Sequence, residues 1–180
     1  AFTTFADIWD CSANRSLALT LVRPFAKLRV VSTDIKDIED LGYTLNYGEV
    51  SYSVKLNRTF NALEGKSFND GEENHTFDYP TPYNDNDPDT TDVDESVTRR
   101  TLFADYIFVD DIAQQDAVQF TMSVYAQDGL LKTTTFNTDI ALHANTLTTI
   151  IGEVLTEGGN VQIEIKGELN EVEKYTVVSS

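Results

Sequence analysis

The chain has 180 residues, of which 41% are hydrophobic and 11% aromatic, so it can bury one well-packed core in a single domain. Lys and Arg number 13 against 30 Asp and Glu, which gives a net charge of −17. This excess of negative charge disfavours nucleic-acid binding, which needs clustered basic residues. It also disfavours docking on an anionic membrane surface.

The single cysteine, Cys11, excludes a disulfide within the chain and a Cys-rich zinc site. We interpret it as a small buried hydrophobic residue, the alternative being a bond between molecules. No stretch approaches the roughly 18 apolar residues of a membrane-spanning helix, and no signal-peptide pattern begins the chain. Because the chain opens at Ala1 rather than Met, we expect a processed protein or one domain of a longer precursor.

Residues 34–41 carry the one helical pattern of the sequence. Apolar residues recur there at every third position: Ile35, Ile38 and Leu41. Asp34 or the threonine before it is expected to cap the start of the helix, and Gly42 to end it. A helix of two turns is too short to stand alone, so we expect a connector packed on a larger structure.

Most of the remaining chain has the patterning of β-strands, in which apolar and polar residues alternate. The predicted strands cover residues 17–22, 25–31, 50–56, 102–109, 118–124, 130–136, 146–154 and 161–165. In the second of them, Ala26, Leu28 and Val30 are expected on the dry face, and Lys27 and Arg29 on the wet face. The turn sequences Asp128-Gly129 and Gly158-Gly159-Asn160 separate the last two pairs of strands.

This pattern predicts an all-β sandwich or barrel of about seven to nine antiparallel strands with one short helix. The clean alternation gives each strand one wet and one dry face, which is typical of antiparallel sheets. A parallel α/β fold would need helices between its strands, and the sequence offers one short helical pattern.

Two regions depart from the strand pattern. Residues 66–100 are rich in Asp, Glu and Pro, and we interpret them as a long acidic loop. The loop is inserted in a single domain that spans residues 1–180, and a short strand is expected within it near residues 76–79. Residues 168–180 form a tail that contains the strand-forming residues Tyr175 and Val177. This tail is expected either to close the edge of the sheet or to reach a neighbouring molecule.

Catalytic and metal-binding signatures are weak in this sequence. The two histidines, His75 and His143, lie outside any nucleophile motif, and a zinc site would need more His and Cys ligands than the chain has. Asp85, Asp87 and Asp89 place carboxylates at alternate positions, as a Ca²⁺ loop does, but Thr90 and Ser96 stand where an EF-hand loop needs Gly and Glu. We therefore expect a solvated acidic loop without a cofactor, with Ca²⁺ as the alternative.

Aromatic residues in or near irregular segments are a further candidate, because exposed rings bind sugars and peptides. Tyr79 and Tyr83 are the interaction candidates that we single out among Tyr43, Tyr47, Phe60, Phe68, Phe77, Tyr79 and Tyr83. The plainer interpretation is that these rings hold the long loop against the sandwich.

Four segments, taken in order, resemble the fimbrillin-like proteins of Bacteroides and related bacteria. They are Leu21-Val-Arg-Pro-Phe-Ala-Lys-Leu-Arg-Val30 with Ser32-Thr33-Asp34, Asn61-Ala-Leu-Glu-Gly65, Ala104-Asp-Tyr-Ile-Phe-Val109, and Asn145-Thr-Leu-Thr-Thr-Ile-Ile-Gly152 with Leu155-Thr156. Their order matches over residues 2–165. The acidic insertion departs from the family pattern.

The resemblance implies a transthyretin-like Greek-key β-sandwich that is the C-terminal domain of a longer precursor. It also implies a lipid-anchored protein on the outer-membrane surface of a Gram-negative bacterium. Subunits of such pili assemble by strand addition, in which a strand of one molecule joins the sheet of another. The family's N-terminal domain, lipid-attachment Cys and protease-sensitive arginine segment are not visible in this sequence.

We therefore expect a non-catalytic fimbrial or adhesive subunit that contacts other subunits, or a host or bacterial surface ligand, through sheet edges and loops. Tyr175 and Val177 are its candidate strand-addition residues. The alternative is a lectin-like module that binds a carbohydrate or peptide with Tyr79, Tyr83 and nearby carboxylates. An enzyme ranks last, because no segment predicts a pocket of convergent polar groups.

Overall fold

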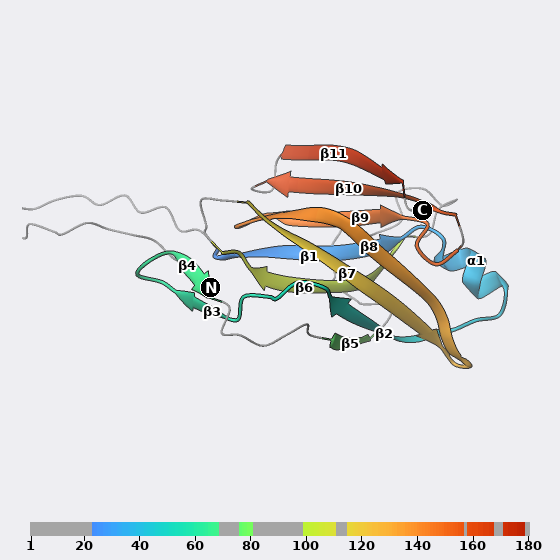
Figure 1. Cartoon of the computed structure of the whole chain (residues 1–180). Helices are drawn as coiled ribbons and strands as arrows, with labels where there is room; N and C mark the ends of the chain where they lie inside the picture. Colours follow the sequence, from blue (N-terminus) through green and yellow to red (C-terminus); the bar gives the residue numbers. More distant parts are fainter. Residues whose placement is uncertain are drawn as a thin grey trace, which may run out of the picture.

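The computed structural model describes residues 23–68, 76–80, 99–110, 115–156, 158–167 and 171–178 (Figure 1). Within these ranges the chain forms β-strands and one short helix, so the all-β prediction is confirmed. The elements are β1 (Phe25–Ser32), α1 (Ile35–Asp40), β2 (Leu45–Tyr52), β3 (Thr59–Asn61), β4 (Lys66–Phe68), β5 (Thr76–Pro80), β6 (Arg100–Phe108), β7 (Gln115–Ala126), β8 (Gly129–His143), β9 (Leu147–Gly152), β10 (Asn160–Gly167) and β11 (Glu171–Val178).

The strands form two main layers that pack face to face in a β-sandwich-like arrangement. One sheet has the order β11-β10-β9-β1-β6, the other has the order β5-β2-β7-β8, and the β3–β4 hairpin forms a small third sheet. In Figure 1 the β7–β8 hairpin crosses the face of the five-stranded sheet. The described ranges hold 11 strands rather than the predicted seven to nine, because β3 and β4, with three residues each, are too short to show a period.

One pair of strands contradicts the antiparallel prediction. β1 pairs with β9 in parallel, from Lys27 opposite Leu147 to Ser32 opposite Gly152. The other neighbours in the sheets are antiparallel. Alternation of apolar residues reports which face is buried but not the direction of the neighbouring strand, so the sequence could not indicate this pair.

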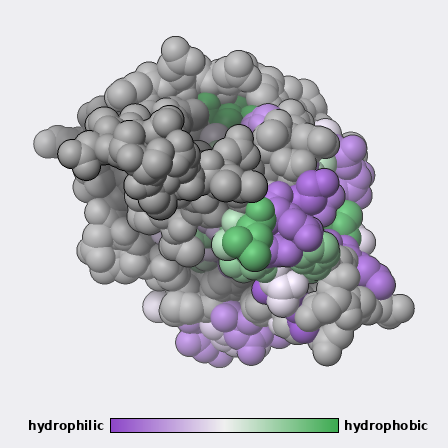
Figure 2. Space-filling view, turned by 90° about the vertical axis from the view of Figure 1, so that its left-hand side faces the viewer, coloured by the Kyte–Doolittle hydropathy of each residue, from purple (hydrophilic) through white to green (hydrophobic). Residues whose placement is uncertain are grey.

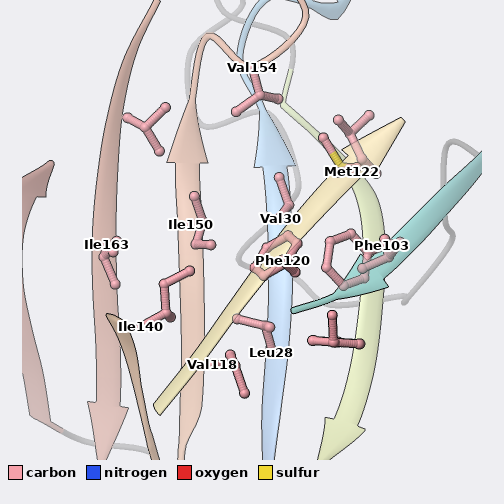
Figure 3. Packing of buried hydrophobic residues seen from close by; sticks show 14 of the residues in the cluster. Leu28, Val30, Phe103, Val118, Phe120, Met122, Ile140, Ile150, Val154 and Ile163 are labelled. Atoms are coloured by element: carbon pink, nitrogen blue, oxygen red, sulfur yellow. The ribbon is translucent and has the colours of Figure 1, made fainter. Parts of the chain in front are cut away.

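The core lies between the two main sheets and is built from the inward residues that the alternation predicts. Leu28 and Val30 of β1 meet Phe120 and Met122 of β7, as Figure 3 shows, and all four are at most 2% exposed. Phe103 of β6 packs edge-to-face on Phe120, with ring centroids 5.5 Å apart.

A hydrogen bond between a buried tyrosine and a half-buried carboxylate lies beside this core. Tyr52 is 0% exposed, and its hydroxyl donates to the Asp105 carboxylate of β6 at 3.0 Å. The bond satisfies the hydroxyl of a buried ring and joins β2 of one sheet to β6 of the other.

β1 is buried on both of its faces. Arg29, which the sequence places on the wet face, is instead 2% exposed, and its Nε donates to the Thr149 hydroxyl of β9 at 2.9 Å. Its neighbour Val31 is also 2% exposed. The wet-face prediction is wrong here because β1 lies between β9 and β6, and the Thr149 hydroxyl of β9 holds the long side chain of Arg29 against the sheet.

The end of β1 is bound to the segment after β9 by one buried carboxylate. Asp34 is 2% exposed and accepts hydrogen bonds from the backbone N–H groups of Val154, Leu155 and Thr156 at 3.3, 2.9 and 2.8 Å. The hydroxyls of Thr156 and Ser32 donate to it at 2.9 and 2.7 Å. We call these contacts the Asp34 clamp.

Helix α1 follows the clamp directly. Asp34 occupies the N-cap position, but its carboxylate makes no capping bond and serves the clamp instead. Ile35 and Ile38 are buried as predicted, whereas Leu41 is 72% exposed because the helix ends at Asp40. Gly42 has φ of 88°, a left-handed conformation that suits glycine after a helix.

The predicted acidic loop and tail both contain strands. Residues 66–68 form β4, and the short strand expected near residues 76–79 is confirmed as β5, which pairs with β2. The remainder of the loop and the strand expected at residues 17–22 lie outside the described residues, as does Cys11. β11 pairs with β10 along its whole length, so the tail closes the edge of its own sheet.

We expect Asp34→Ala to lower the free energy of unfolding by about 3 kcal/mol, because two buried N–H groups and one half-buried N–H group lose their acceptor and each buried loss costs roughly 1–3 kcal/mol. Urea unfolding followed by circular dichroism measures this change. The control is Asp40→Ala, at an exposed position of α1, where we expect a change within about 0.5 kcal/mol. Equal effects of the two substitutions would contradict the clamp.

Candidate functional site

The outer face of the four-stranded sheet carries pairs of short hydroxyl side chains. Hydroxyl oxygens of cross-strand neighbours lie 3.0 to 3.2 Å apart in three pairs: Ser51 with Thr76, Thr121 with Thr135, and Ser123 with Thr133. Each pair occupies directly opposite positions in the strand register. These pairs follow from the period of two, which turns every second residue of the strands away from the core.

Two tyrosines continue this face toward the turn between β7 and β8. Tyr47 of β2 lies opposite Tyr125 of β7, and their rings stack with centroids 4.4 Å apart and planes at 5°. The Tyr125 hydroxyl donates to Glu49 Oε2 at 2.8 Å. We call the pair Tyr47 and Tyr125 the tyrosine platform.

The platform lies in a negative electrostatic environment. The hydrogen bond to Glu49 raises the pKa of Tyr125, with smaller contributions from burial and from the negative charges of Glu49 and Asp78. Glu49 and Asp78 are directly opposite each other on β2 and β5. Like charges at opposite positions repel, so this part of the face favours a positive ligand.

Exposed apolar side chains lie at the same end of the molecule as the platform. Leu41 is 72% exposed and Tyr43 37% exposed in the link between α1 and β2, and Leu130 at the start of β8 is 58% exposed. Gln127 locks this link to the turn, because its amide accepts the Thr44 N–H and donates to the Gly42 carbonyl. Figure 1 shows the link and the hairpin tip at the same end of the molecule.

The edge strand β8 is divided into an exposed and a buried half. Its residues from Gly129 to Asp139 are exposed or half-buried, whereas Ile140 to Leu142 are buried. Residues 137–139 face the single residue Gln119, and this bulge separates the two halves. Among the strands that the structure describes, the regular stretch from Lys132 to Phe136 has no partner on its outer side, since β8 ends the order of its sheet.

A second aromatic group lies at the opposite end of the molecule, near the β3–β4 hairpin. Phe25 packs edge-to-face on Tyr106, and Phe60 of the hairpin stacks on Phe108. The Lys27 ammonium lies 5.8 Å from the centroid of the Tyr106 ring. Figure 2 looks onto this end of the molecule and shows apolar atoms next to strongly hydrophilic ones.

A small open pocket of about 160 Å³ lies where β6 ends and β7 begins. Lys55, Asn57, Asp110 and Asp116 are among its lining residues, and the Asp116 carboxylate accepts the Asp110 N–H at 2.6 Å. The pocket is smaller than the roughly 300–1,000 Å³ of typical ligand sites. In the described ranges Ser67 has a buried hydroxyl without a hydrogen-bond partner, and its backbone N–H donates to the Asp110 carbonyl.

The structure places some of the residues that the sequence singles out. Tyr79 lies in β5 opposite Gly48, and Tyr175 and Val177 lie in β11 opposite Ile163 and Val161. His143 ends β8, and its carbonyl accepts the Thr146 N–H and hydroxyl. Three groups fall outside the described residues: His75, Tyr83, and the calcium candidates Asp85, Asp87 and Asp89.

The sequence identified half of the platform. Tyr47 is among its candidate aromatics, although it lies in a strand rather than in an irregular segment. Tyr125 was missed, because the predicted strand ends at Val124. The alternation itself carried the signal, since Tyr125 continues the outward series of Gln119, Thr121 and Ser123.

We expect Glu49→Gln to lower the pKa of Tyr125 toward its ordinary value, because the substitution removes a charged acceptor that favours the protonated phenol. Since the raised pKa belongs to the folded state, the bond stabilises the fold at lower pH and is lost as pH rises through that pKa. NMR titration of the tyrosine ring carbons measures the shift. Asp78→Asn is the comparison and should lower the pKa less, and an unchanged Tyr125 titration in Glu49→Gln would contradict the assignment.

Among the residues that the structure places, no helix is long and apolar enough to cross a membrane, and no three His, Cys, Asp or Glu side chains gather as metal ligands would. No curated protein matches the chain in sequence. A family model described as a family of unknown function, DUF6562, matches residues 1–177. The chain therefore belongs to the DUF6562 family.

Proposed function

We propose that the chain is a non-catalytic structural or adhesive subunit of a bacterial surface assembly, such as a fimbria or pilus, and that it works by strand pairing at its sheet edges. Its partner is another subunit or a ligand on a host or bacterial surface. In this proposal the sandwich has the transthyretin-like Greek-key arrangement, and the precursor is exported and lipid-anchored on the outer membrane of a Gram-negative bacterium.

The exposed half of β8 is the observation that carries this proposal. Natural proteins protect edge strands with charges, prolines or covering loops, because a free row of N–H and C=O groups pairs with other chains. From Lys132 to Phe136 the edge holds one charged residue and no proline, and Thr133 and Thr135 are exposed. Such an edge is suited to accept a strand from a partner molecule.

The four segments that resemble fimbrillin-like proteins support the proposed fold. Val30 in the first of them lies opposite Ile150 in the last, and Asp34 of the first binds Leu155 and Thr156 of the last. Segments of a shared fold are expected to meet in this way in the middle of a sheet. A shared fold does not imply a shared function, so the functional step rests on the β8 edge.

We expect the double substitution Thr133→Lys and Thr135→Lys to abolish concentration-dependent assembly, because lysines on an edge strand oppose the approach of a second strand. Sedimentation velocity and electron microscopy in physiological salt measure the assembly. The matched control, Thr121→Lys with Ser123→Lys, puts the same charge on the same face of the central strand β7 and should leave assembly intact. A wild-type chain that stays monomeric at high concentration, or equal assembly of both variants, would refute the β8 edge as the contact.

We expect a chain truncated after Leu169 to have a lower melting temperature, because β10 loses the strand that pairs with it along its whole length. A synthetic peptide of residues 171–178 should restore the melting temperature in trans, as strand addition requires. The same peptide with Thr176→Pro is the control, because proline removes a donor and is poorly tolerated within a sheet. No loss on truncation, or no rescue by the wild-type peptide, would exclude β11 as an exchangeable strand.

A further inference from the structure

Exposed apolar side chains gather where the α1–β2 link meets the turn of the β7–β8 hairpin. We define the tip patch as Leu41, Tyr43, Leu130 and the tyrosine platform. Leu41 and Leu130 are 72% and 58% exposed, and Tyr43 and Tyr47 are 37% and 36% exposed. An exposed apolar group with a polar rim is typical of a protein-interaction site.

The rim of the tip patch is mainly acidic. Glu39 and Asp40 directly precede Leu41, and Asp128 follows Gln127 in the turn; all three are exposed. Glu49 and Asp78 bound the platform along β2 and β5. Within the part of the chain that the structure describes, no Lys or Arg forms an ion pair with any of these carboxylates.

Two tyrosine groups among the described residues differ in whether a basic side chain already lies near the ring. Tyr106, at the opposite end, already has the Lys27 ammonium 5.8 Å from its ring centroid. The platform rings stack on each other, and Tyr125 donates to Glu49. Leu130 lies opposite Tyr125 and Pro80 opposite Tyr47 in the strand register, so a cation reaches the rings where they remain exposed to solvent. An exposed aromatic ring attracts a cation, most often an Arg guanidinium.

Charge also decides which partner fits. A contact between the tip patches of two copies is disfavoured, because their acidic rims would face one another. Anionic polymers and anionic lipid surfaces are disfavoured for the same reason. A basic segment binds favourably for three reasons. It relieves the repulsion between Glu49 and Asp78, it places a cation against an aromatic ring, and it covers exposed apolar surface.

We propose that the tip patch docks a basic peptide segment of a partner protein, in which an Arg or Lys side chain packs against the tyrosine platform and pairs with Glu49 and Asp78, and an adjacent apolar side chain covers Leu41 or Leu130. Leu130 is the one residue of the patch in β8, and it precedes the stretch from Lys132 to Phe136 that is proposed to pair with a partner strand. This docking is therefore independent of strand pairing, and either can fail without the other.

The experiment is an NMR titration of the ¹⁵N-labelled chain with two synthetic peptides. One contains two arginines that flank a leucine, and the other has citrulline in place of each arginine, which keeps the shape and removes the charge. We expect the arginine peptide to perturb residues 39–49 and 125–130 first. Glu49→Gln and Tyr47→Ala should each weaken its binding about tenfold, consistent with an ion pair or a cation–aromatic contact of order 1–2 kcal/mol.

Matched variants distinguish binding at the tip patch from nonspecific attraction of the peptide to the acidic surface. Tyr106→Ala removes an exposed tyrosine at the other end and should leave the affinity unchanged. Tyr47→Leu keeps apolar bulk if the alanine variant folds poorly, and it too should weaken binding. The proposal is overturned if the citrulline peptide binds equally well, or if the chemical-shift changes spread over the whole acidic surface. Wild-type affinity in both Tyr47 variants would also overturn it, as would a neutral glycan that perturbs these residues when the arginine peptide does not.

Discussion

The parallel pairing of β1 with β9 joins parts of the chain that are 120 positions apart, and the rest of the five-stranded sheet is built on both sides of it. Backbone pairing alone would leave the end of β1 free to slide against β9. Two buried polar contacts fix the register, the bond from Arg29 to Thr149 along the strands and the Asp34 clamp where they end. Closing so long a loop costs conformational entropy, which these specific contacts and the burial of the surrounding apolar residues offset.

This arrangement explains why the two sheets differ on their outer faces. The five-stranded sheet buries Arg29 and Val31 on the outer face of β1, whereas the four-stranded sheet turns short hydroxyls and two stacked tyrosines outward. Only its inner face is needed for the core, so the outer face tolerates an acidic cross-strand pair that a buried face could not. The bulge at residues 137–139 then turns the end of β8 inward, where the Ala141 carbonyl accepts the Thr148 hydroxyl, and leaves the first half at the edge of the sheet that the described strands form.

The sequence predicts what depends on local period and misses what depends on distant partners. The inward series Val118, Phe120, Met122 and Val124 is buried as its alternation predicts, and the helix near Ile35 and Ile38 forms where expected. The parallel direction of β9, the buried state of Arg29 and the use of Asp34 as a clamp each require knowledge of which strands are neighbours. For the same reason half of the platform was missed, since a stack across β2 and β7 depends on register between segments that the sequence does not relate.

The acidic side chains of the tip patch indicate a binding site only in combination with its aromatic and apolar side chains. The chain has 13 Lys and Arg residues for 30 acids, so most carboxylates must remain in water without a partner, and an acidic surface alone indicates nothing. What distinguishes the tip is the coincidence of opposed carboxylates, a stacked aromatic pair and exposed leucines on one rigid face. Because Gln127 ties the α1–β2 link to the β7–β8 turn, these groups are held together before any partner arrives. A preorganised surface loses little entropy on binding, so modest individual contacts there can add up to specific recognition.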